Sequence, residues 1–249
     1  MKRLRRNILT GMISCLIFQT LPAQVYVEQG FGFQHDGPLV SVYGPDAWVK
    51  KIPLSRVAGS PFFNEELSLA SLFDKNAKLI RTVPARMNLA TGQLHFIWNG
   101  DELVADDGNL VAAVIFHPNN DTAKVEALFV KNVPNLLLHK KPVNGFVQVL
   151  NPGQFQLLKY TTRIVLPDRD SLFGTQKRFK FKDNIFYFLR SGDKIEKLKK
   201  LNEENVMAGI PAAAAYKEWI NSNKLELTKE EEVVSFLNYL NTRISSPAQ

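Results

Sequence analysis

The middle of the chain alternates apolar and polar residues with the two-residue period of half-buried β-strands. Leu94, Phe96 and Trp98 share one side of one such strand, and Phe179 and Phe181 share one side of another. A sheet of such strands buries one face and leaves the other in water. The predicted strands are Leu39–Tyr43, Lys78–Val83, Arg86–Leu89, Gln93–Trp98, Val111–Phe116, Val125–Val130, Phe146–Leu150, Phe155–Leu166, Arg178–Phe181 and Ile185–Leu189.

Turn-forming residues separate these strands. Asn99-Gly100, Asp107-Gly108 and Asn144-Gly145 supply the positive φ angles that tight hairpins need. We therefore expect neighbouring strands to be antiparallel.

Near residue 192 the apolar period becomes helical. Asp193 is the predicted N-cap of a helix that ends near Gly209. Pro211 suits the first position of a second helix. Thr228 and Glu231 have the spacing of a capping box for a third helix.

Strands followed by helices predict an α+β fold. Residues 24–190 form the antiparallel β-rich part, as a curved sheet or a sandwich, and residues 191–244 form about three helices packed on it. Residues 245–249 are a short tail. One domain and a β domain with a helical cap both fit this pattern.

The first 23 residues have the three parts of an export signal. The apolar run Ile8–Phe18 is shorter than the roughly 20 residues that span a bilayer, and Leu21-Pro22-Ala23 offers a cleavage site. The basic residues before the run are Lys2, Arg3, Arg5 and Arg6. We expect an exported protein, in the periplasm or outside the cell, with no transmembrane segment in its mature chain.

Removal of this signal changes the chemistry of the chain. The net charge is +7, and residues 1–23 carry four cations and no acid, which leaves +3 for the mature chain. This charge does not favour nucleic-acid binding. Cys15, the only cysteine, lies inside the signal, so the mature chain has no disulfide and no thiol nucleophile.

The segment from Gly59 to Asn64, Gly-Ser-Pro-Phe-Phe-Asn, resembles one found in a large set of uncharacterised exported proteins of the Bacteroidota. In those proteins a strand with an Arg-x-Asn core comes next, which Arg86-Met87-Asn88 matches except that Met87 replaces an aromatic residue. The resemblance implies export and a consistent fold, and it implies no activity. The residues that carry it, without an assigned role, are Gly59, Ser60, Pro61, Phe62, Phe63, Asn64, Arg86 and Asn88.

No residue pattern predicts catalysis. The chain lacks Gly-x-Ser-x-Gly and His-Glu-x-x-His, and Ser60 stands in a turn between glycine and proline. We therefore predict no catalytic residue, metal or cofactor. The histidines, which lie far apart in the sequence, are His35, His95, His117 and His139.

The strongest charge feature is the basic stretch Lys177–Lys182, followed by further lysines at 194, 197, 199 and 200. It suits contact with an acidic surface, such as anionic lipid headgroups or an envelope polysaccharide. It also suits a water-facing strand edge on which lysine opposes aggregation, and this second interpretation is favoured.

Three functions remain open. The leading hypothesis is a non-enzymatic envelope or secreted module that binds a partner protein or a surface component. The alternative is a periplasmic carrier whose curved sheet shelters an apolar ligand such as a lipid chain, motivated by 17 Phe residues. The third is an enzyme with an unrecognised site. A carrier needs an apolar cavity, a binding module an exposed apolar patch, and an enzyme converging polar groups in a cleft.

Two hydroxyl residues are candidate O-glycan sites. Thr122 and Ser171 stand in Asp-Thr-Ala and Asp-Ser-Leu triplets, which resemble the site at which these bacteria glycosylate exported proteins. An intact mass of the natively expressed protein equal to that of the bare polypeptide would rule this out.

The export signal predicts a mature protein that starts at Gln24, or within one or two residues of it. Ala23→Arg places a large cation where a small residue is needed, so the precursor should accumulate uncleaved. Leu21→Ala, which keeps Ala23 and places a second small residue at position 21, is the matched control and should be processed normally. N-terminal sequencing and intact mass of cell fractions measure both, and normal processing of Ala23→Arg would contradict the assignment.

Overall fold

The structure is a computed structural model that describes residues 39–43, 49–105, 110–168, 179–211 and 213–245. All of them belong to one of the chain's two compact units, Asp36–Gln249. The predicted signal, Arg178, Ser171 and residues 246–249 lie outside the described residues.

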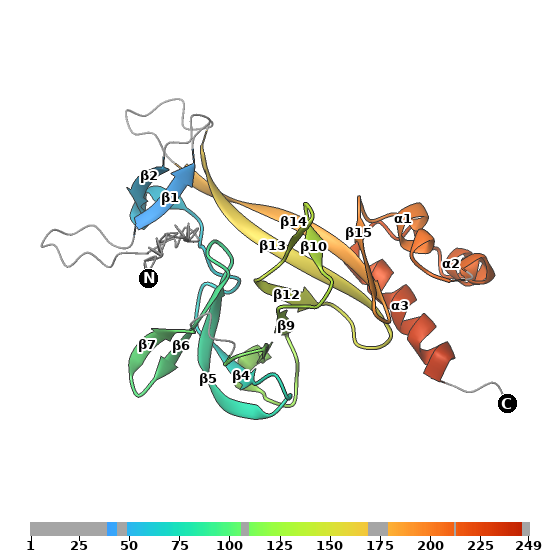
Figure 1. Cartoon of the computed structure of the whole chain (residues 1–249), viewed down its shortest axis with the longest axis horizontal. Helices are drawn as coiled ribbons and strands as arrows, with labels where there is room; N and C mark the ends of the chain where they lie inside the picture. Colours follow the sequence, from blue (N-terminus) through green and yellow to red (C-terminus); the bar gives the residue numbers. More distant parts are fainter. Residues whose placement is uncertain (1–38, 44–48, 106–109, 169–178, 212, 246–249) are drawn as a thin grey trace, which may run out of the picture. The chain divides into compact units, whose positions relative to one another are not determined.

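Figure 1 shows the order of the elements along the chain. The strands are β1 (Leu39–Tyr43), β2 (Val49–Pro53), β3 (Val57–Ala58), β4 (Ser68–Phe73), β5 (Leu79–Asn88), β6 (Gln93–Trp98), β7 (Asp101–Val104), β8 (Ala113–Phe116), β9 (Ala127–Lys131), β10 (Leu137–Leu138), β11 (Lys141–Pro142), β12 (Phe146–Val149), β13 (Phe155–Pro167), β14 (Phe179–Ser191) and β15 (Lys194–Leu198). The helices are α1 (Glu203–Ala208), α2 (Lys217–Ser222) and α3 (Glu230–Ser245), with short 3₁₀ turns at Leu54–Arg56, Pro118–Asn120 and Ala213–Tyr216.

Eleven strands form one sheet, in which neighbours follow the order β15-β14-β13-β12-β9-β8-β4-β5-β6-β7. The strand off this path is β3, which pairs with β14 in parallel, whereas the neighbours along the path are antiparallel. The hairpins β1–β2 and β10–β11 stand outside this sheet. The predicted α+β fold is confirmed, and its β part is one large, mostly antiparallel sheet with two separate hairpins.

Buried side chains gather differently along this sheet. Across β4, β5, β6, β8 and β9, one face is buried around residues such as Leu94 and Phe116. On β13 and β14, both faces are covered. Successive side chains of a strand point to opposite faces, so neighbouring residues belong to different clusters. Leu157 and Leu189 pack against the helices, whereas Leu158 and Phe188 pack against residues flanking the β10–β11 hairpin.

The helix α3 is attached to the sheet by a polar contact at its first turn. The Nζ of Lys159 donates to Glu230 Oε1 at 2.7 Å, and the hydroxyl of Tyr187 donates to the same oxygen at 2.5 Å. Burial and this hydrogen bond raise the pKa of the Tyr187 hydroxyl. One carboxylate of α3 therefore binds both β13 and β14.

The helix predicted from Asp193 is wrong. Lys194–Leu198 form strand β15, which pairs with β14, and the first helix begins at Glu203. Gly192 has φ +60°, which permits the tight turn that returns the chain onto β14. The actual N-cap is Asn202, whose Oδ1 accepts from the Asn205 N–H at 3.0 Å. The helical part therefore starts at residue 203 and not at 191.

The other two predicted helices exist with different starts. The second begins as the 3₁₀ turn Ala213–Tyr216 before α2. Ahead of α3, the Thr228 N–H donates to Glu232 Oε2 at 3.1 Å, so Glu232 and not Glu231 fills the acidic position of the predicted cap.

Two pairs of predicted strands are single long strands. The sequence places a break at Pro84, yet β5 runs through it. Proline lacks the N–H that a ladder needs, but β6 pairs only with Ala85–Asn88, so no bond to β6 is lost. Similarly β14 runs through the polar residues Lys182–Asn184 because all of β13 pairs with it.

A close contact joins α3 to the turn before β13. The Phe155 N–H donates to Asn241 Oδ1, and Asn241 Nδ2 donates to the carbonyls of Pro152 and Phe155, each at 2.9 Å. Gly153 lies directly against this side chain, since a Cβ at Gly153 would stand 2.3 Å from Asn241 Nδ2. The helix can approach this closely only because residue 153 has no side chain.

Gly153→Ala should therefore destabilise the protein through both its φ of +115° and the collision with Asn241. Gly92→Ala is the matched control, because Gly92 has φ +71° and nothing within 4 Å of the added Cβ. We expect Gly153→Ala to lower the free energy of unfolding by about 2 kcal/mol more than the control. Urea denaturation measures both, and equal losses would show that the contact with Asn241 is unimportant.

Candidate functional site

The residues that carry the family resemblance come together in the structure. We call residues 59–64, Arg86 and Asn88 the motif cluster. Phe62 forms a β-bridge to Asn88, the Phe63 N–H donates to Met87 O at 2.8 Å, and the Leu89 N–H donates to Pro61 O at 2.8 Å. Segment 59–64 therefore lies along the second half of β5.

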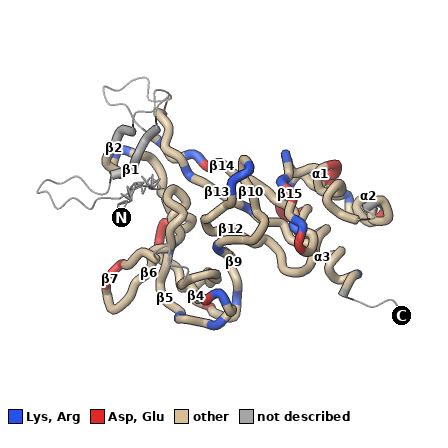
Figure 2. The backbone as a smooth tube through the Cα atoms, viewed as in Figure 1, with Lys and Arg blue, Asp and Glu red and all other residues tan. Residues whose placement is uncertain are grey.

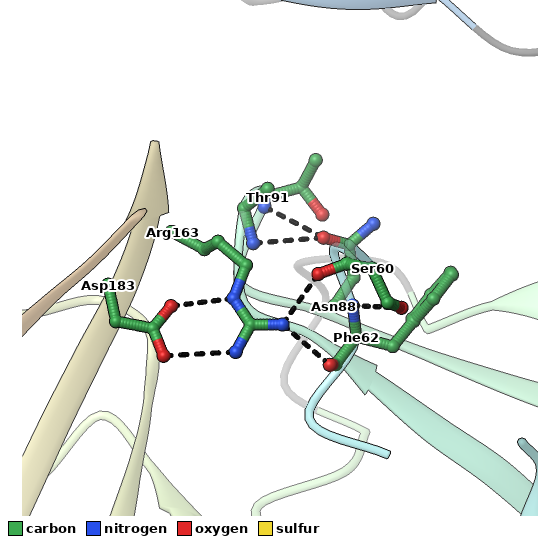
Figure 3. A network of polar contacts seen from close by, with 7 residues as sticks. Ser60, Phe62, Asn88, Thr91, Arg163 and Asp183 are labelled. Carbon is green, nitrogen blue, oxygen red and sulfur yellow. Dashed lines mark hydrogen bonds and ion pairs between the residues drawn. The ribbon is translucent and has the colours of Figure 1, made fainter. Parts of the chain in front are cut away.

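Arg163 on β13, which the sequence did not single out, joins this cluster (Figure 3). Its Nη1 donates to the carbonyls of Ser60 at 2.6 Å and Phe62 at 2.8 Å. Its Nε and Nη2 donate to the two oxygens of Asp183 at 2.6 and 3.0 Å. A guanidinium suits this role, because its fork of donors binds a carboxylate with two bonds and still has donors for carbonyls.

Asn88 shapes the turn that follows β5. Its side chain is 8% exposed, and its Oδ1 accepts from the N–H groups of Ala90 at 3.0 Å and Thr91 at 3.2 Å. In such turns the side-chain oxygen of asparagine accepts the hydrogen bonds that a backbone carbonyl would otherwise accept. The role of Asn88 is therefore to form the β5–β6 hairpin.

Arg86 lies on the more exposed side of the motif cluster. It donates to both oxygens of Glu102, at 2.7 and 3.0 Å, and its guanidinium stacks 3.9 Å from the centre of the Phe62 ring. His95 Nδ1 lies 3.0 Å from Glu102 Oε1, and the His95 ring meets the edge of Phe62. Burial raises the pKa of Glu102, but the hydrogen bonds and charges of Arg86 and His95 outweigh it and hold that pKa below its ordinary value.

The remaining motif residues are also internal contacts. Phe63 packs against Phe116 and Phe129, and Asn64 Nδ2 donates to Ser68 Oγ at 3.1 Å. Gly59 has φ +88°, which glycine adopts without strain. The polar groups of the motif cluster thus mostly bind neighbouring residues of the same fold, namely Arg163, Glu102, Ser68 and the turn after β5.

A second polar network was not predicted. His117 Nδ1 donates to Lys124 O at 2.7 Å, since a carbonyl can only accept, and its Nε2 lies 2.9 Å from Ser71 Oγ. Thr82 Oγ1 lies 3.0 Å from Ser71 Oγ. A serine hydrogen-bonded to a histidine is also a feature of nucleophilic catalysis. Here Ser71 and His117 are 8% and 5% exposed, so the network satisfies buried polar groups between β4, β5 and the turn after β8.

The other sequence candidates are Thr122 and the basic stretch, and the described end of that stretch lies beside the motif cluster, where Lys180 pairs with Ala58. Thr122 is exposed in the turn before β9, as its glycan assignment requires, and the assignment stays a prediction. Within the basic stretch, Lys180 pairs with Asp168 at 2.9 Å, and Lys194 pairs with Glu196 at 2.6 Å. Among the described residues, no group of three or more His, Cys, Asp or Glu converges as a metal site would require.

Two pockets, each of about 480 Å³, are open to solvent. One lies beside the motif cluster between Ala58–Ser60, Arg163 and Phe181–Asp183. The other lies on α3 around Glu230, Val234 and Asn238, with Leu150 at its side. Neither is the enclosed apolar chamber that the carrier hypothesis requires. In the described part of the chain, no helix is long and apolar enough to cross a membrane.

Comparison with known proteins adds no further assignment. No family model, no curated protein and no solved structure matches this chain. The resemblance to exported Bacteroidota proteins therefore stays a prediction.

The contacts of Arg163 predict a stability role. Arg163→Ala removes four hydrogen bonds and leaves two carbonyls and the Asp183 carboxylate unpaired, so we expect a loss of about 2–3 kcal/mol in the free energy of unfolding. Arg86→Ala is the matched control, because it breaks a comparable bidentate pair without carbonyl contacts, and it should cost about 1 kcal/mol. Chemical denaturation compares them, and a loss from Arg86→Ala as large as from Arg163→Ala would contradict the assignment.

Proposed function

We propose that the protein is an exported, non-enzymatic module that binds a partner protein or a surface component, in the periplasm or outside the cell. The observation that carries this proposal is strand β7, at the edge of the large sheet. All of its residues are exposed, and no described strand pairs with its outer edge. An unpaired edge of this kind can accept an extended segment of a partner as an additional strand.

The orientation of the backbone supports this use of β7. The Ala105 N–H donates to Leu94 O at 2.8 Å, so the N–H groups of alternate residues, Leu103 and Asp101, also face β6. The N–H groups of Glu102 and Val104 therefore face the free edge. Leu103 and Val104 are 42% and 44% exposed, so the strand also offers apolar surface next to these outward N–H groups.

Charged side chains commonly protect free sheet edges from association, and β7 carries Asp101 and Glu102. The charge of Glu102 is compensated, because Arg86 binds it through both oxygens. Arg86 itself is held against Phe62, so these side chains are ordered before a partner arrives. These side chains of the protein would therefore lose little conformational freedom when a partner binds at this edge.

The rival functions have weaker support from the geometry. The motif cluster uses its polar groups in internal contacts, and the Ser71–His117 pair lines neither of the two pockets. The two pockets are open and partly lined by charged residues, which does not suit an apolar ligand. A binding module accounts for the exposed edge without an additional assumption.

A photo-crosslinking residue in place of Leu103 tests the proposal in the native cells. We expect one discrete adduct of higher mass, which Val104→Pro abolishes, because proline removes the outward N–H without removing a bond to β6. Val104→Thr is the matched control and should keep the adduct, since threonine retains the donor and β-branched shape.

A crosslinking residue in place of Val125, which is 62% exposed but does not belong to a strand, controls for non-specific crosslinking. The same adduct from Val125, or an adduct at residue 103 that survives Val104→Pro, would contradict partner binding at this edge. A normal thermal unfolding midpoint for Val104→Pro verifies that the fold is retained.

A further inference from the structure

A second surface, around the β10–β11 hairpin, combines exposed cations with an exposed apolar side chain. We call Leu137–Lys141, with Lys197 of β15 and Lys199 directly after that strand, the hairpin face. Residues 127–167 contain no Asp or Glu, and the hairpin lies within this range. Figure 2 shows the basic positions on the hairpin.

The cations of the hairpin face are available for an external partner. Lys140, Lys141, Lys197 and Lys199 are exposed, and none forms an ion pair with a described residue. Lys197 Nζ stands 4.8 Å from the centre of the Phe186 ring, which holds it on the face that the hairpin covers. Glu196, the acidic residue of β15, alternates to the opposite face beside Gly209.

The turn of the hairpin is made by unusual residues. His139 and Lys140 have φ +52° and +65°, so both occupy the left-handed region of a type I′ turn. Asn-Gly forms such a turn at lower cost, and each residue with a Cβ costs about 1 kcal/mol there. Lys140 therefore places its charge at the hairpin tip at a cost in backbone strain. Strained residues of this kind are often found at functional sites.

An apolar side chain accompanies the charges. Leu137 is 51% exposed at the hairpin, whereas its neighbour Leu136 is buried in the cluster beneath. The rings of His139 and Phe186 make a T-shaped contact, and Phe186 stacks with Tyr160. The hairpin therefore packs on aromatic rings of β13 and β14. Cations next to an exposed apolar residue match the interface of an anionic membrane, where headgroups attract lysine and the acyl region accepts leucine.

We propose that the hairpin face binds the surface of membranes that contain anionic phospholipid, with Lys140 and Lys141 at the headgroups and Leu137 inserted between them. A polysaccharide would match the lysines but not the leucine, and this favours lipid. The inference goes beyond the proposed partner binding, because β7 and the hairpin face are separate surfaces. In an exported protein, such a surface would keep the module next to the membrane.

Vesicle flotation of the exported protein, after signal removal, tests this inference. Vesicles of phosphatidylethanolamine and phosphatidylglycerol should carry the protein, and vesicles of phosphatidylcholine should not. Lys140→Gln with Lys141→Gln should weaken binding about 20-fold, since each lysine at an anionic surface contributes roughly a factor of five. Leu137→Ser should weaken it roughly fivefold.

The matched control is Lys75→Gln with Lys78→Gln, which removes the same charge from two exposed lysines in the β4–β5 turn. This variant should bind vesicles as the wild type does. Equal weakening by both double variants, or equal binding to phosphatidylcholine, would overturn the proposal. Unchanged binding of Leu137→Ser together with competition by dextran sulfate would also overturn it and indicate an acidic polysaccharide. Val104→Pro should leave vesicle binding unchanged, which separates this result from the β7 proposal.

Discussion

The guanidinium of Arg163 is the contact that joins distant parts of the fold. It binds the carbonyls of Ser60 and Phe62, which lie 103 and 101 positions earlier in the chain, and Asp183 on the neighbouring strand. The N–H of the same residue donates to Leu89 O at the end of β5. One arginine on β13 therefore fixes β5 and β14 as well as the motif segment. Several strands separate β5 from β13 along the sheet, so strand pairing alone does not specify that these two strands lie close together. The contacts of Arg163 fix this proximity.

The motif cluster illustrates how a resemblance in sequence differs from a site. The sequence assigned its residues no role, and in the structure Asn88 forms a turn, Arg86 stacks on the Phe62 ring, and the carbonyl of Ser60 accepts from Arg163. Internal hydrogen bonds of this kind specify one arrangement of the chain. The surfaces that we propose for binding contain none of the motif residues. They are the free edge of β7 and the β10–β11 hairpin, whose residues are mostly exposed.

The sequence predicts the fold class because period-two alternation and turn residues are local signals. It predicts Gln93–Trp98 with its bounds, and Leu39–Tyr43 likewise. It fails where a distant partner decides the structure. Ile195 and Leu198 have helical spacing, yet pairing with β14 extends that segment as a strand. The role of Arg163 and the Ser71–His117 pair were equally unpredictable, because neither has a local pattern and both depend on strands that meet only in the sheet.

The contact between Asn241 and the turn at Gly153 has a consequence for the timing of folding. Helix α3 supplies Val233, Phe236, Leu237 and Leu240 to the cluster that covers β13–β15, and residue 241 completes the hydrogen bonds of Phe155. Until α3 has left the ribosome, Leu157 and Leu189 lack the apolar partners that bury them. This face of β13–β15 therefore stays uncovered after its own strands have been synthesised. The strands can pair with one another earlier, but their packing on this side has to wait for the helix.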